Sequence, residues 1–150
     1  MSGRASALSG ADLKLGGARR LAIGVGCRRG CADAAIAALV ERALDAGAVS
    51  GGEPHALFTT EHKRGEPGLP AAAERLGLPL YYLSDELLRA VQSRLATRSA
   101  AAERRFGIPS VAEAAALAGA GPHSVLVVPR ISDNGATCAI AAAMTPEAPP

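Results

Sequence analysis

The sequence predicts an α/β fold, a three-layer α/β/α sandwich around a mostly parallel five-stranded sheet with an antiparallel last strand. Three observations support this prediction. Short apolar runs alternate with amphipathic helical patterns, which is typical of a parallel sheet covered by helices. The first run, residues 20–26, is almost continuously apolar, as expected of a strand buried on both faces. The run at 124–128 is followed by a turn at 133–135 and another run at 136–143, which favours an antiparallel pair.

The first half of the chain contains three predicted strands and two predicted helices. After the strand at 20–26, a helix presents one apolar face and is expected to end at Gly47. A second strand covers 56–60. The next helix opens with Pro70 near its first turn and ends at Gly77, because the Leu-Pro pair that follows forces an extended chain. Residues 80–83 form the third predicted strand.

The second half begins with helices and ends with the last two strands. Ser84 is expected to cap a helix running to about Leu95, with acidic residues in its first turn. Ser99 is expected to cap a short helix that ends at Gly107. Ser110 forms a capping box with a glutamate three residues later, and this helix is expected to end at Gly119. For 136–143 a helix is the alternative to a strand, because alanine favours helices.

The length of 150 residues fits one domain, which we place at 20–144. Residues 1–19 are rich in Ser, Gly and Ala and are expected to be a disordered lead, and the proline-rich residues 145–150 a disordered tail. No apolar run approaches the length of a membrane helix, and no signal-peptide core is recognisable. The three cysteines suggest no disulfide framework, so we expect a protein of the reducing cytoplasm.

Composition argues against two classes of partner. A net charge of +2 is too small for a nucleic-acid surface, and the absence of tryptophan argues against nucleobase stacking. Of the 16 basic residues only Lys14 and Lys63 are lysines. Arginine binds carboxylates through two parallel hydrogen bonds, so this bias is compatible with a polyanionic ligand. A GC-rich genome is the preferred explanation of the same bias.

A candidate anion site follows from the strand order. Ligands of open α/β sheets bind beyond the carboxyl ends of the strands. Polar loops at 27–30, 61–68, 84–86 and 130–134 are therefore expected to converge there. The first loop carries adjacent arginines between glycines, and the second carries a Lys-Arg pair. Together with the start of the helix at Ser110, these cations and backbone N–H groups suit carboxylates or phosphates.

Other chemistries have weaker support. The glycines at 24 and 26 resemble a dinucleotide fingerprint, but the third glycine arrives one residue late, and only Glu61 favours a nicotinamide or flavin cofactor. Cys27 and Cys31 are four residues apart, which is not a metal-binding spacing, and the histidines also lack one. We therefore expect neither a metal nor a cofactor. Cys31 is interpreted either as a reactive thiol at a helix start or as a small residue in a tight turn.

Five segments in register carry a family resemblance. They are Gly-Val-Gly-Cys-Arg-Arg-Gly-Cys at 24–31, Lys-Arg-Gly-Glu-Pro-Gly-Leu at 63–69, Leu-Gly-Leu-Pro-Leu at 76–80 followed by Ser-Asp-Glu-Leu at 84–87, Ser-Val-Ala-Glu-Ala-Ala-Ala-Leu at 110–117, and Ala-Thr-Cys-Ala-Ile-Ala at 136–141. The chain thereby resembles the CobE/CbiG C-terminal family of cobalamin-biosynthesis proteins. The matched segments occur in order between residues 21 and 143.

The resemblance implies a function in vitamin B12 biosynthesis. It implies a three-layer α/β/α domain that handles a precorrin or hydrogenobyrinic-acid-type tetrapyrrole, a flat ring with acetate and propionate arms. Longer relatives carry N-terminal domains and open the ring lactone of cobalt-precorrin-5A, releasing a two-carbon fragment. This chain lacks those domains, so we expect the stand-alone form of the aerobic pathway, with other cobalamin-pathway enzymes as further partners and no nucleic acid or membrane.

The resemblance and the predicted anion site together define the candidate residues. Ligand binding is assigned to Gly26, Cys27, Arg28, Arg29, Gly30, Lys63, Arg64, Glu66, Ser99, Ser110 and Glu113. The preferred interpretation is a carrier or chaperone of a labile corrin-ring intermediate. The alternative is a precorrin-5-type lactone hydrolase or ring-contraction enzyme, in which Glu66 or Glu113 is the general base and an arginine stabilises the oxyanion. Arg98 stands before Ser99 where many relatives have proline, which leaves that helix start less defined.

Overall fold

A computed structural model describes residues 20–48, 52–98, 100, 103–104, 107–108 and 110–143. The predicted lead at 1–19, the predicted tail at 145–150 and the candidate Ser99 lie outside the described residues. Within the described part, no helix is long and apolar enough to span a bilayer.

The described strands form a five-stranded sheet in the order β3-β2-β1-β5-β4. They are β1 (Arg20–Cys27), β2 (Glu53–Thr60), β3 (Leu80–Leu83), β4 (Ser124–Asp133) and β5 (Ala136–Ala143). Both β2 and β3 run parallel to β1, whereas β5 pairs antiparallel with β1 and with β4. Four strands therefore share one direction and only the last runs against them, which confirms the predicted sheet. The helical alternative for 136–143 is wrong.

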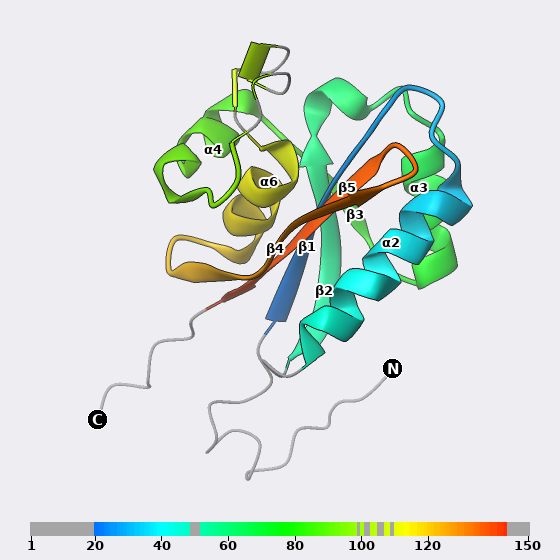
Figure 1. The fold of residues 1–150 in the computed structure, drawn as a ribbon, viewed down its shortest axis with the longest axis horizontal. Coiled ribbons are helices and arrows are strands. Elements are labelled where there is room, and N and C mark those ends of the chain that lie inside the picture. The colour runs from blue at the N-terminus through cyan, green and yellow to red at the C-terminus, as the bar shows by residue number, and fades with distance from the viewer. Residues whose placement is uncertain are drawn as a thin grey trace, which may run out of the picture.

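Helices cover both faces of the sheet and complete the three layers (Figure 1). One face carries α2 (Asp33–Ala46) and α3 (Gly68–Leu76), whose apolar side chains share a core cluster with β1 and β5. The other face carries α4 (Asp85–Arg89) and α6 (Val111–Ala120), which form a second, alanine-rich cluster. Two short 3-10 turns, η2 (Glu61–Lys63) and η3 (Gln92–Arg94), connect these elements.

Two predicted helix ends are wrong. The helix that begins after Ser84 stops at Arg89 and continues only as η3, instead of running to about Leu95. The last helix continues past Gly119 to Ala120. Gly119 is a packing glycine, because a Cβ there would lie 2.5 Å from the ring of Phe58. The predicted ends at Gly47 and Gly77 are confirmed, and Gly77 has the left-handed backbone typical of a helix end.

The close approach of α6 to the sheet depends on small residues. A Cβ on Gly24 would lie 1.9 Å from the carbonyl oxygen of Ala112 and 2.5 Å from the nitrogen of Ala116. Only a glycine in β1 therefore lets this helix lie so near the strand. The first turn of α6 is thereby held beside the carboxyl end of β1. Gly24, one of the two glycines that resemble a dinucleotide fingerprint, thus serves this packing.

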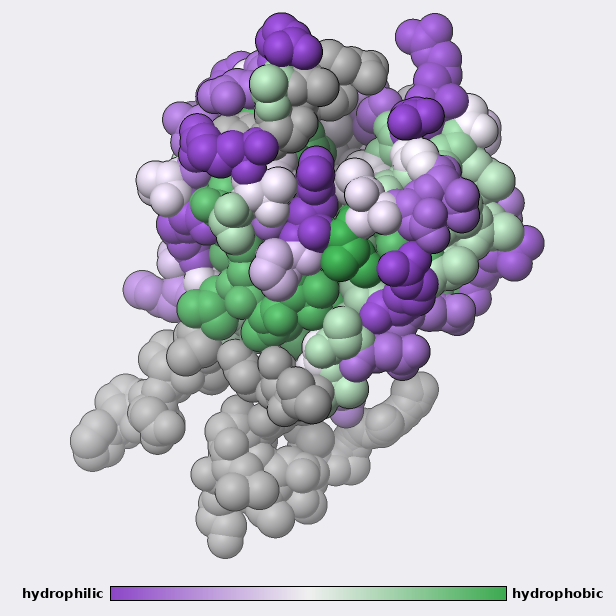
Figure 2. Space-filling model, in the orientation of Figure 1, coloured by the Kyte–Doolittle hydropathy of each residue, from purple (hydrophilic) through white to green (hydrophobic). Residues whose placement is uncertain are grey.

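Strand β4 lies at an edge of the sheet and is irregular. Its pairing with β5 shifts twice, between Leu126 and Val128 and between Val128 and Ile131. Figure 2 shows hydrophobic residues gathered over the β4 side of the molecule, where Val125 is 43% exposed. The second shift lies near the carboxyl edge of the sheet, where it shapes the site described next.

Candidate functional site

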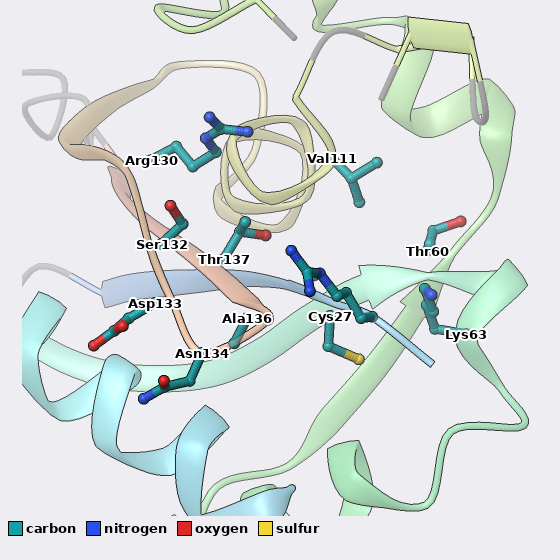
Figure 3. Close-up of a pocket in the computed structure, with 13 residues that line it drawn as sticks. Cys27, Thr60, Lys63, Val111, Arg130, Ser132, Asp133, Asn134, Ala136 and Thr137 are labelled. Carbon is teal, nitrogen blue, oxygen red and sulfur yellow. The ribbon is translucent and has the colours of Figure 1, made fainter. Parts of the chain in front are cut away.

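A cavity of about 460 Å³ opens at the carboxyl ends of β1, β2 and β4, which is the predicted edge of the sheet (Figure 3). Its volume falls within the range typical of small-molecule pockets. Its lining comprises Gly26, Cys27, Arg28, Thr60, Lys63, Val111, Arg130, Ser132, Asp133, Asn134, Gly135, Ala136 and Thr137. Val111 is the first residue of α6, so this helix begins at the cavity.

The end of β1 forms the floor of this cavity together with the β4–β5 hairpin. Gly26 leaves room for the Thr137 side chain, since a Cβ on Gly26 would lie 2.7 Å from the Thr137 hydroxyl oxygen. The backbone N–H of Arg28 donates to the carbonyl oxygen of Gly135 at 2.8 Å. The methylenes of Arg28 lie over Gly135, where a Cβ would meet the Arg28 Cδ at 3.5 Å. These contacts hold the Arg28 side chain at the cavity.

Lys63 is a buried cation on the opposite wall. It ends η2, its exposed fraction is 7%, and it lines the cavity with Thr60. The Thr60 hydroxyl oxygen accepts a hydrogen bond from the backbone N–H of His62, which caps the turn that carries Lys63. Lysine is seldom buried to this degree. In Figure 3, Lys63 and Arg130 lie on opposite sides of the cavity, with Cys27 and Thr137 between them.

Arg130 reaches the cavity because of the bulge in β4. Val128 pairs with Ile140 and Ile131 pairs with Cys138, so Pro129 and Arg130 together face one residue of β5. Proline has no backbone N–H group to donate to a neighbouring strand, so Pro129 is tolerated in this bulge. Bulges at sheet edges also redirect side chains, here that of Arg130. The N–H of Arg130 donates to Glu113 Oε2 at 2.9 Å.

Glu113 connects three segments around the site. Its side chain is fully buried in α6. Its carboxylate accepts hydrogen bonds from the N–H of Ala96, the N–H and hydroxyl of Thr97, and the N–H of Arg130. The predicted capping box is half correct, because the Ser110 hydroxyl oxygen accepts from the N–H of Glu113 at 3.3 Å, but the carboxylate serves these other donors. Neither residue is among those that line the cavity.

Only some of the four cations that were expected at the site line the cavity. Arg28 and Lys63 line the cavity, whereas Arg29 and Arg64 are exposed and absent from its lining. The guanidinium of Arg64 lies 4.7 Å from the centre of the Tyr82 ring, a cation–π contact. Arg130 contributes the third basic side chain of the lining. The cavity is therefore basic through a different set of residues from the one expected.

Two of the four polar loops meet through a direct hydrogen bond. The N–H of Gly30, whose φ is +78°, donates to Glu66 Oε1 at 2.8 Å. This contact joins the loop after β1 to the loop before α3. The loop at 84–86 lies beside His62 and contributes no residue to the cavity lining.

The thiols at the site are neutral. Burial raises the pKa of Cys27 to about 11, although the nearby Lys63 opposes this rise. Burial also raises the pKa of Cys31, and the Glu66 carboxylate adds to the effect. This direction is opposite to that of an activated thiolate. The Cys31 thiol donates to the carbonyl oxygen of Asn134 at 3.6 Å, so it fills a tight turn against the hairpin.

Sequence reasoning missed part of the site. Arg130, Ser132 and Asn134 fall in a loop that was expected to converge on the site, but no role was assigned to them. Thr137, inside the last predicted strand, also reaches the cavity, and no role at the site was assigned to it. The proline before Arg130, inside an otherwise strand-like run, was the available signal, because proline within a sheet indicates an edge or a bulge.

The electrostatic balance of the cavity favours an anion. Arg28, Lys63 and Arg130 contribute positive charge, and Asp133 is the acidic residue of the lining. The Asp133 carboxylate is paired with Arg42 at 2.9 Å. Guanidinium and ammonium groups beside a concave, partly apolar surface suit carboxylate or phosphate ligands.

Comparisons with known proteins agree on one family. The family described as Cobalamin synthesis G C-terminus matches residues 21–141. Protein CobE of Sinorhizobium sp is 36% identical over 125 residues, which cover 83% of this chain and 81% of the relative.

Solved structures support the same assignment. The crystal structure of CobE, a protein from the cobalamin (vitamin B12) biosynthetic pathway, is 39% identical, with a TM-score of 0.77, and the match covers 86% of this chain and 94% of that one. The crystal structure of the cobalamin biosynthesis protein chiG from Agrobacterium tumefaciens is 37% identical, with a TM-score of 0.64. The match covers 85% of this chain and 99% of that one. The chain is therefore a CobE-like cobalamin biosynthesis protein and belongs to the Cobalamin synthesis G C-terminus family.

Proposed function

We propose that this protein binds a precorrin or corrin-ring intermediate and delivers it to the next enzyme as a carrier or chaperone. The observation that carries the proposal is the cavity at the carboxyl edge of the sheet, with Arg28, Lys63 and Arg130 in its lining. Tetrapyrrole intermediates of this pathway carry acetate and propionate arms, which such side chains bind through charge-assisted hydrogen bonds. We place this role in the cytoplasm, where free thiols stay reduced.

The size of the cavity suggests how the ring is held. A volume of about 460 Å³ suits a drug-sized molecule, and a corrin macrocycle with its arms is considerably larger. We therefore expect the cavity to take one edge of the ring and its carboxylate arms, with the remainder of the ring outside. Ala136 and Val111 supply apolar surface for the ring edge, and Thr137 supplies a hydroxyl.

A carrier has more support than a hydrolase. The Glu113 carboxylate is fully buried and already accepts hydrogen bonds from Ala96, Thr97 and Arg130, so it offers little to a water nucleophile. Glu66 is partly buried and holds the loop after β1 through Gly30. Both carboxylates proposed as general bases thus have a positioning role in this structure.

Titration with hydrogenobyrinic acid, followed by absorbance, tests the proposal. We expect saturable binding at one ligand per chain, and the neutral heptamethyl ester should bind at least about tenfold more weakly, because it has lost its carboxylate charges. The recovered ligand should have an unchanged mass. Equal affinity for acid and ester would contradict a carboxylate-binding cavity, and catalytic turnover of a precorrin-5-type lactone would establish the hydrolase in place of the carrier.

A further inference from the structure

We propose that Glu61, His62 and Asp85 form a binding site for a divalent transition-metal ion, separate from the tetrapyrrole cavity. Each of these residues offers one ligand atom, and within the described part of the chain these atoms lie within 4.8 Å of one another. The set combines an imidazole nitrogen with carboxylate oxygens, which is the ligand chemistry of zinc and its neighbours.

The sheet register explains why these residues meet. Strands β2 and β3 are parallel neighbours, and their last residues, Thr60 and Leu83, are paired. The residues that follow the two strands therefore leave the sheet side by side. His62 lies two positions beyond Thr60 and Asp85 two beyond Leu83, so the register places them opposite each other. Sequence spacing alone does not reveal this pair, because 23 residues separate them.

The observed separations suit a shared ion. His62 Nε2 lies 2.9 Å from one Asp85 carboxylate oxygen and 3.0 Å from the other. Two ligands bound to zinc at about 2.0–2.1 Å lie about 2.9–3.4 Å apart when they subtend a right or tetrahedral angle. The distance between these two ligand atoms therefore already matches that of two ligands of one ion, which would replace the hydrogen bond between His62 and Asp85.

The backbone beneath the site is held in place. The Thr60 hydroxyl oxygen accepts from the N–H of His62 at 3.2 Å, and the Ser84 hydroxyl oxygen accepts from the N–H of Leu87 at 3.3 Å. These caps fix the turn that carries His62 and the helix that begins at Asp85. The Arg89 guanidinium lies 4.0 Å from Asp85 on an exposed surface, where it can move aside. A metal would tie η2 to α4.

The site is accessible to an ion from solvent. The side chains of His62 and Asp85 are 49% and 30% exposed, and Glu61 is exposed. Three protein ligands leave a coordination position for water. Because Thr60 and Lys63, which flank Glu61 and His62 in sequence, line the cavity, the proposed ion would lie near the rim of the cavity while using none of its lining residues.

Calorimetric titration of the untagged protein with zinc chloride tests the site. We expect one ion per chain, and at least about tenfold weaker binding after His62→Ala or Asp85→Asn. Asp33→Asn is the matched control, because Asp33 also begins a helix and pairs with an arginine, at 2.6 Å, but is not part of the three-residue group. This control should bind zinc like the unmodified protein. Circular dichroism confirms that each variant is folded.

Cobalt(II) absorption separates this site from a thiolate site. Cobalt bound by nitrogen and oxygen should give no sulfur-to-metal charge-transfer band, and Cys27→Ser with Cys31→Ser should leave binding unchanged. Absence of zinc binding, full affinity in both His62→Ala and Asp85→Asn, or loss of binding in the double cysteine variant would overturn the proposal. These measurements use no tetrapyrrole, so their outcome is independent of the proposed carrier function.

Discussion

The backbone N–H of Arg130 donates a hydrogen bond to the buried Glu113 carboxylate at 2.9 Å. This contact joins α6 to the bulge in β4, where the pairing with β5 skips one residue. The bulge leaves the Arg130 N–H without a ladder partner, and the carboxylate supplies one. A buried glutamate thereby helps to aim a basic side chain into the cavity.

Replacing Glu113 with glutamine should reduce the free energy of unfolding by about 1.5–3 kcal/mol. The amide keeps the shape of the side chain but offers one acceptor oxygen where the carboxylate has two, and its NH₂ group faces N–H donors. Urea unfolding measures this loss. Glu41→Gln, at an exposed position of α2, is the control and should change stability by less than about 0.5 kcal/mol. Equal stability of both variants would contradict the structural role of Glu113.

Replacing Gly24 with alanine should destabilise the fold by about 1–3 kcal/mol or more, because the new Cβ would meet the backbone of α6 at 1.9 Å. The helix must then move away from β1, and Val111 at the cavity moves with it. Gly65→Ala is the matched control, since a Cβ there meets nothing within 4 Å. Thermal unfolding of the two variants makes the comparison. A Gly24→Ala protein as stable as the control would disprove the close approach of α6 to the sheet.

Cys27 should react slowly with iodoacetamide at neutral pH. Its pKa is raised to about 11, so the thiol stays protonated, and only the thiolate is a strong nucleophile. The labelling rate should keep rising with pH beyond 9, reach half of its maximum near pH 11 and level off only above that pH. Peptide mass spectrometry after timed labelling gives the rate at each pH. A rate that has already levelled off at pH 7 would mean that the Cys27 pKa is lowered.

Much of the fold follows from local sequence patterns, whereas helix lengths depend on tertiary contacts. The glycine stops at Gly47 and Gly77 were predicted correctly, because each ends an amphipathic pattern. Gly119 was misinterpreted as a stop, because its reason lies in the distant Phe58 ring. Local patterns contain no information about such a long-range contact.

The candidate site was predicted in position but only partly in composition. Strand order placed it at the carboxyl edge, where Arg28 and Lys63 do line the cavity. Arg64 was expected beside them, yet it stacks on Tyr82, since side-chain direction within a loop depends on its neighbours in space. Arg130 was missed because its orientation arises from a bulge, and a bulge is set by the pairing register of two strands.

The most direct test of the account is the affinity for hydrogenobyrinic acid after each cavity cation is replaced by glutamine. Arg28→Gln, Lys63→Gln and Arg130→Gln should each weaken binding by about tenfold to a hundredfold, as expected for loss of a charge-assisted contact worth about 1.5–3 kcal/mol. Arg20→Gln is the control, because Arg20 begins β1 at the opposite edge of the sheet. It should bind as the unmodified protein does. If all four variants bind equally well, the ligand does not occupy this cavity and the proposed carrier function loses its structural basis.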